Sequence, residues 1–149
     1  MIRHTWIAVC FLLSGCSDTF DKFYPSYPDA VSDGAVLRGW MPNQLPDDAF
    51  HIREQHNIDN NRGRGVFHFH ETNRDVWTNY FNNKHHLDCY KKIGLGKDDF
   101  QFLSKNNITI NMESSDCFYD SQFFYIVDFQ GCKGLFFTIR NKRMKEAVP

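Results

Sequence analysis

The N-terminal segment limits what the rest of this chain can fold into. A short apolar run at residues 6–13 follows Arg3. A helix rises about 1.5 Å per residue, so this run is too short to cross a hydrocarbon core about 30 Å thick. A charged start followed by a short apolar run is typical of an export signal that is later cleaved. We therefore expect residues 1–15 to be a signal peptide and to take no part in the fold.

The expected cleavage site, Leu13-Ser14-Gly15-Cys16, resembles the lipobox of bacterial lipoproteins, with an aliphatic residue, two small residues and a cysteine. Small residues give the peptidase access to the bond, and only a thiol can form the thioether to diacylglycerol. The resemblance implies that Cys16 becomes the lipidated N-terminus, and more than one acyl chain makes such an anchor stable. Ser17 follows where aspartate would favour the inner membrane. We therefore expect an anchor that faces the periplasm, with the outer membrane favoured over the inner.

The length and charge of the mature chain limit the number of domains it can form and the partners it can bind. Cleavage after residue 15 leaves 134 residues (149 minus 15), which suits one domain with a sizeable core. Residues 16–33 are polar and contain two prolines, so we expect a lipidated N-terminus and a tether there, and a single globular domain over 34–149. Without Arg3 the chain keeps 16 of its 17 basic residues against 18 acidic ones. That balance gives no electrostatic footprint for nucleic acid.

Apolar and polar residues alternate in several segments, and this alternation predicts strands. The predicted strands are 35–38, 50–56, 66–71, 108–112, 123–129 and 135–140. An apolar stripe predicts one principal helix over 73–81, with Thr72 as its N-cap. We make no prediction for residues 84–107. The sequence thus predicts an α+β fold in which one principal helix packs on a mostly antiparallel sheet.

A further resemblance rests on Gly39-Trp40-Met41-Pro42, on Leu45-Pro46 and on Ile58-Asp59-Asn60-Asn61. Together these residues look like a recurring pattern, G-W-x-P-x-x-L-P followed by I-D-x-N, in small bacterial lipoproteins of uncharacterised function. The resemblance implies lipoprotein status and a shared α+β domain. It implies no catalytic residues. The residues expected to form the structural motif are Trp40, Pro42, Leu45, Pro46 and Asp59.

Three histidines suggest a metal site. If the hairpin turn centres near residue 60, His51 lies opposite His70, and His68 shares their face. Three imidazoles on a rigid face could hold zinc or copper. The competing interpretation is a solvated polar face and no cofactor. The sequence leaves both open.

Three cysteines remain if Cys16 is lipidated, and an oxidising periplasm favours a disulfide between two of them. Cys117 and Cys132 flank the strand predicted at 123–129, which places them roughly 20 Å apart. A disulfide needs Cα atoms within about 7 Å. We therefore expect Cys89 to form the bridge, and we favour Cys89–Cys117 over Cys89–Cys132. Three free thiols are the alternative.

No recognisable constellation for nucleophilic or acid–base catalysis accompanies these features. The sequence therefore predicts a lipid-anchored, non-catalytic binding module whose partner is an envelope protein or an incoming protein, as in immunity-type proteins. The alternative is a small periplasmic metal-binding protein or enzyme that uses the face of His51, His68 and His70.

Overall fold

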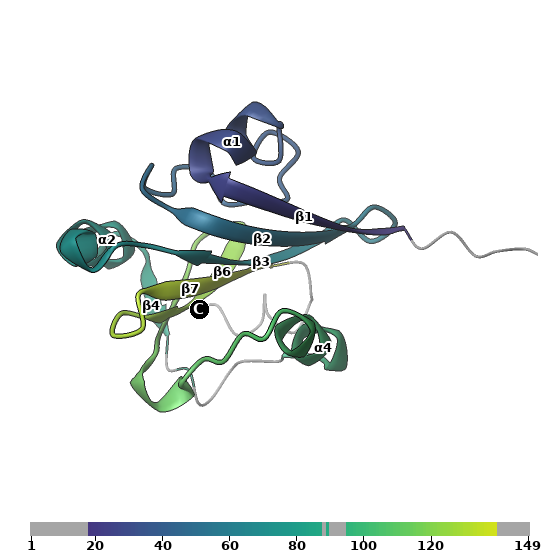
Figure 1. Ribbon diagram of the computed structural model, residues 1–149. Helices are drawn as coiled ribbons and strands as arrows, with labels where there is room; N and C mark the ends of the chain where they lie inside the picture. The colour runs from purple at the N-terminus through teal and green to yellow at the C-terminus, as the bar shows by residue number, and fades with distance from the viewer. Residues whose placement is uncertain (1–17, 88, 90–94, 140–149) are drawn as a thin grey trace, which may run out of the picture.

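The computed structural model describes residues 18–87, 89 and 95–139, so the expected signal peptide and Cys16 lie outside the described residues. Seven antiparallel strands form one sheet in the order β1-β2-β3-β7-β6-β5-β4 (Figure 1). The strands are β1 (Thr19–Ser26), β2 (Phe50–Asn57), β3 (Arg62–His68), β4 (His85–Leu87), β5 (Asp116–Tyr119), β6 (Phe123–Asp128) and β7 (Lys133–Thr138). The helical elements are α1 (Tyr27–Ser32), η1 (Glu71–Asn73), α2 (Arg74–Asn82), α4 (Lys97–Lys105) and η2 (Met112–Ser114). The predicted α+β class is confirmed.

Both faces of the sheet carry a hydrophobic core. On one face, Phe67 and Tyr125 pack with residues of α1 and α2. On the other, Val66 and Ile126 pack with residues near α4. Figure 1 shows α1 above the sheet and α4 below it. Every residue of β6 is buried because β6 lies inside the sheet and both of its faces are covered. Among the described residues, no helix is long and apolar enough to span a membrane.

Glycines and phenylalanines pair across β3 and β7. Gly65 pairs with Phe136, and Phe67 pairs with Gly134. Each phenylalanine ring occupies the space where a Cβ of its partner glycine would sit. Two large rings can therefore lie on one face of the same strand pair at full packing density.

The expected tether at 16–33 is wrong over its described part. Residues 19–26 form the edge strand β1, and residues 27–32 form α1. Tyr24 of β1 is only 5% exposed. Ser26 caps α1 in a capping box with Asp29, whose carboxylate accepts a hydrogen bond from the Ser26 N–H at 3.1 Å. Charged residues lie between the aromatic ones in this segment, and for this reason the sequence does not indicate its regular structure.

The element boundaries need further corrections. Residues 35–38 form turns and residues 108–111 have no regular structure, so neither is a strand. The first strand of the C-terminal meander is instead β5, which contains Cys117. Thr72 lies within η1 and Asn73 precedes α2, so Thr72 does not cap that helix. The helix predicted at 73–81 matches α2, whereas α4 falls in the segment without a prediction.

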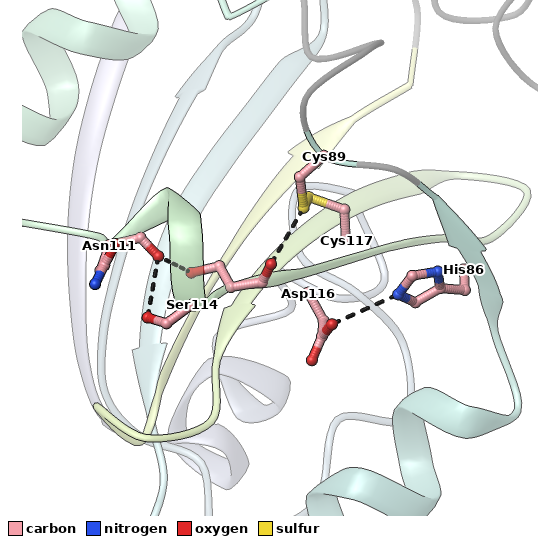
Figure 2. Close-up of a disulfide and its surroundings, with 7 residues drawn as sticks. His86, Cys89, Asn111, Ser114, Asp116 and Cys117 are labelled. Atoms are coloured by element: carbon pink, nitrogen blue, oxygen red, sulfur yellow. Dashed lines mark hydrogen bonds and ion pairs between the residues drawn. A yellow bond between two sulfur atoms is a disulfide. The ribbon is translucent and has the colours of Figure 1, made fainter.

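The predicted disulfide is confirmed. Cys89 and Cys117 are bonded, with Cα atoms 5.3 Å apart and a sequence separation of 28 (Figure 2). In the same region the His86 Nε2 lies 3.5 Å from an Asp116 carboxylate oxygen. Cys132 is a free thiol in the turn between β6 and β7. A bridge that closes a loop of this length restricts the unfolded chain, and in the chain-entropy model this stabilises the folded state by roughly 3–4 kcal/mol.

Candidate functional site

Four side chains stack in a column at the β1 edge of the sheet, and we call them the Trp40 column: Phe20, His56, Trp40 and Arg38. The ring centroids of His56 and Trp40 are 3.5 Å apart, with an interplanar angle of 8°. Phe20 also stacks with His56, with ring centroids 5.4 Å apart and an interplanar angle of 16°. The Arg38 guanidinium lies 4.2 Å from the Trp40 ring. The column joins β1 and β2 to the segment between α1 and β2.

Backbone contacts hold Trp40 in place. Its N–H donates to the Ala35 carbonyl at 3.1 Å. Gly39 precedes Trp40 and has a φ of 73°. Glycine adopts this positive φ readily, whereas residues with a Cβ rarely do. Gly63 of β3 lies so close that a Cβ there would be 2.6 Å from the Trp40 carbonyl oxygen. Glycine at both positions therefore permits the loop to lie flat against the sheet.

The other residues of the expected structural motif support the same loop. Leu45 is 2% exposed and belongs to the hydrophobic core. The Pro42 carbonyl accepts a hydrogen bond from the Tyr27 hydroxyl at 3.1 Å, and the Pro46 carbonyl accepts one from the Ala49 N–H at 3.0 Å. Asp59 is different because it is exposed in the β2–β3 turn. A hydrogen bond and the negative charge of Asp18 raise the pKa of Asp59.

A buried acid and a buried histidine lie beneath Trp40. The side chains of Glu54 and His56 are 0% and 3% exposed, and Nδ1 of His56 lies 3.0 Å from both Glu54 carboxyl oxygens. Burial raises the pKa of Glu54 to about 8, against a smaller opposing effect of the Lys22 and Arg38 charges. Burial also lowers the pKa of His56. Both directions favour a protonated Glu54 whose O–H donates a hydrogen bond to a neutral His56.

A hollow of about 330 Å³ opens beside the Trp40 column, and we call it the Trp40 hollow. Asp33 organises its charged side: its carboxylate accepts from the Tyr24 hydroxyl at 2.8 Å, from Arg38 at 3.0 Å and from Lys22 at 3.3 Å. These three donors lower the pKa of Asp33. The lining side chains are Phe20, Lys22, Asp33, Arg38, Trp40, His56 and Ile58. None of them is a serine, threonine or cysteine nucleophile.

A second, polar pocket of about 410 Å³ lies on the opposite face of β1, β2 and β3, against α4, and we call it the α4 pocket. Strand neighbours point to opposite faces, so Thr19 and Gln55 line this pocket while Phe20 and His56 line the hollow. Two ion pairs join α4 to the sheet here. They are Arg64–Asp99 and Lys105–Asp21, each with an N–O distance of 2.6 Å.

The three histidines of the expected metal site gather around Phe50. The ring centroids of His51, His68 and His70 lie 5.0, 5.9 and 4.5 Å from the Phe50 centroid. The predicted register is wrong, because Phe50 pairs with His68 and a bulge follows at His51. In the described part of the chain, no three His, Cys, Asp or Glu side chains are placed to hold a metal ion.

Sequence reasoning did not identify Glu54, His56, Arg38 or Asp33 as site residues. One signal for the buried pair was present. Glu54 and His56 share the strand phase of Ile52, which is fully buried. Two polar residues in the buried phase of a strand indicate a partnered polar pair in the core. Arg38 and Asp33 lie in the turns that follow α1. Turns have no apolar periodicity, so no sequence pattern indicates that these two residues belong to the site.

Comparison with known proteins gives one match. Residues 18–68 match the family model described as the YbbD head domain. No curated protein and no solved structure matches the chain. The matched segment runs from β1 to the end of β3 and contains every residue of the Trp40 column as well as Glu54. The column is therefore internal to the segment that resembles this family.

Substituting Glu54 with glutamine should flatten the pH dependence of stability. The folded-state pKa of about 8 lies above the ordinary value of 4.5, so the folded protein retains a proton that the unfolded chain loses. The free energy of unfolding should therefore fall as the pH rises from about 4.5 to 8, by a few kcal/mol at about 1.4 kcal/mol per pKa unit. Glu54→Gln keeps a donor for His56 and should lack this fall. Urea unfolding at pH 5 and pH 8 measures the difference.

The lowered pKa of His56 acts in the opposite sense, because it costs stability as the pH falls below 6.5. The wild type and Glu54→Gln both contain His56 and share this effect. The difference between their pH profiles of unfolding free energy therefore reports the titration of Glu54. Glu71→Gln is the matched control, since the Glu71 side chain is 78% exposed. It should keep the wild-type slope. Parallel pH profiles for the wild type and Glu54→Gln would show that Glu54 titrates as an ordinary carboxyl.

Proposed function

We propose that the mature chain is a lipid-anchored, non-catalytic binding module that faces the periplasm, with the outer membrane favoured. The lipobox-like residues Leu13-Ser14-Gly15-Cys16 support the anchor. The disulfide Cys89–Cys117 supports an oxidising compartment. The chemistry of the two concave sites supports binding over catalysis, because the side chains that line them bind by charge, hydrogen bonding and apolar contact.

The α4 pocket carries the proposal, because it is large enough for part of a partner and its lining is almost entirely polar. Its cations are Arg62, Arg64 and Lys105, and its carboxylate is Asp98. The rest of the lining consists of four amide side chains, one hydroxyl and one aromatic ring: Gln55, Asn57, Asn60, Gln101, Thr19 and Phe102. The Arg64 side chain is 12% exposed and is fixed by its ion pair with Asp99. Prearranged charges of both signs fit a polar, charged segment of a protein partner and set its orientation. An incoming toxin neutralised in the periplasm would be one such partner.

Lipidation can be tested directly. Cys16→Ala should remain an unprocessed precursor and should incorporate no labelled palmitate, because no other residue offers a thiol at the cleavage site. The wild type should be shortened and labelled. Cys132→Ala is the matched control, since it removes a free thiol in the β6–β7 turn, and it should be processed and labelled normally. Normal processing and labelling of Cys16→Ala would contradict the anchor.

The contact surface can be tested by photo-crosslinking in intact cells. A photoreactive amino acid at Gln101, which lines the α4 pocket, should give a discrete adduct with one envelope or incoming protein. The same residue at Asn79, which is exposed on α2, serves as the control and should not give that adduct. Arg62→Glu should remove the Gln101 adduct because it reverses a lining charge. Equal adducts from Gln101 and Asn79 would argue against the pocket as the contact surface.

A further inference from the structure

The described part of the chain begins close in sequence to the proposed anchor. Asp18 is the first described residue, and its carbonyl accepts a hydrogen bond from the Ile58 N–H at 2.9 Å. Two residues of fully extended chain span at most about 7 Å, so Asp18 can lie no further than that from Cys16. A lipidated Cys16 would therefore hold the start of β1 and the β2–β3 turn at the headgroups of the bilayer.

Exposed apolar side chains occur at this end of the molecule. Phe20 is the second residue of β1 and is 45% exposed. Ile58, whose N–H donates to the Asp18 carbonyl, is 56% exposed. Both line the Trp40 hollow, together with Trp40 and the cations Lys22 and Arg38. Aromatic side chains combined with aliphatic and cationic ones are the residue types that favour the bilayer interface.

We propose that the Trp40 hollow is a membrane-contact surface, in which Phe20 and Ile58 enter the headgroup region of the bilayer that holds Cys16. This inference rests on the proposed lipid anchor. The covalent attachment keeps the surface at a high local concentration, so two apolar side chains are enough for a stable contact. The surface carries both signs of charge, with Lys22 and Arg38 beside Asp33. Such a surface matches zwitterionic headgroups, which also carry both signs.

The proposed contact also orients the molecule. The α4 pocket lies on the opposite face of β1, β2 and β3 from the Trp40 hollow. When the hollow rests on the bilayer, the α4 pocket faces the periplasm and is accessible to a partner. One sheet then separates a membrane-facing side from a partner-facing side.

Tryptophan quenching in vesicles tests the contact. After loss of the signal peptide the chain has two tryptophans, Trp40 and the fully buried Trp77. The lipidated protein is placed in phosphatidylcholine vesicles with or without lipid that is spin-labelled at the headgroup. We expect the Trp40 emission to fall about two-fold or more with the labelled lipid, because interfacial aromatic side chains lie at that depth. Trp40→Phe, which keeps the aromatic stack and leaves Trp77, should show little quenching.

Surface variants identify the side chains that make the contact. The double variant Phe20→Ser/Ile58→Ser should lose most of the Trp40 quenching, whereas the control Val76→Ser, at a 53% exposed position on α2, should keep it. Unchanged quenching in the double variant would overturn the proposed surface. Quenching of Trp40 no greater than that of Trp77, in protein that floats with the vesicles, would overturn it as well.

Other outcomes separate this inference from the anchor. Protein that carries no lipid and does not float with vesicles contradicts the proposed anchor. Protein that floats but shows no quenching of Trp40 contradicts only the membrane contact. If Trp40 is shielded from iodide in whole envelopes but neither quenched nor shielded in protein-free vesicles, a protein occupies the hollow and the membrane contact is overturned.

Discussion

The hydrogen bond between Glu54 and His56 is the interaction on which the N-terminal half of the structure depends. A carboxyl side chain with 0% exposure is costly to bury unless it is neutral and partnered, and Nδ1 of His56 at 3.0 Å provides the partner. The same imidazole supports Trp40, which stacks on it at 3.5 Å. Loss of Glu54 would leave the buried Nδ1 of His56 without this partner, and loss of His56 would also remove the ring on which Trp40 stacks.

Coverage of both faces of the sheet explains why the two concave sites lie back to back. The α1 face holds the Trp40 hollow, and the α4 face holds the α4 pocket. The sheet is closely packed near its centre, where Gly65 and Phe136 pair across β3 and β7. Ion pairs join α4 to β1 and β3 beside the α4 pocket. The two sites differ in their position relative to the proposed lipid anchor: the Trp40 hollow is proposed to face the bilayer, and the α4 pocket to face the periplasm.

Sequence patterns predicted the elements whose signals are local. The strands at Phe50–Asn57 and Phe123–Asp128 and the helix at Arg74–Asn82 follow from apolar periodicity. Trp40 and Leu45 were singled out by the resemblance that includes Gly39-Trp40-Met41-Pro42 and Leu45-Pro46. β1 was missed because an edge strand with one covered face exposes most of its residues. The Asp33 contacts with Lys22 and Arg38 depend on the turns after α1 and on the pairing of β1 with β2. Such long-range contacts leave no periodic trace in a single sequence.

The pKa of the Glu54 carboxyl is the most direct test of this account. Carbon-detected NMR of protein with ¹³C-labelled glutamate side chains would follow the Glu54 carboxyl through a pH titration, with Glu54→Gln to assign the signal. We expect a midpoint near 8, because burial disfavours the charged form of the carboxyl. A midpoint near 4.5, the ordinary value for a glutamate, would contradict the buried, proton-sharing pair beneath Trp40.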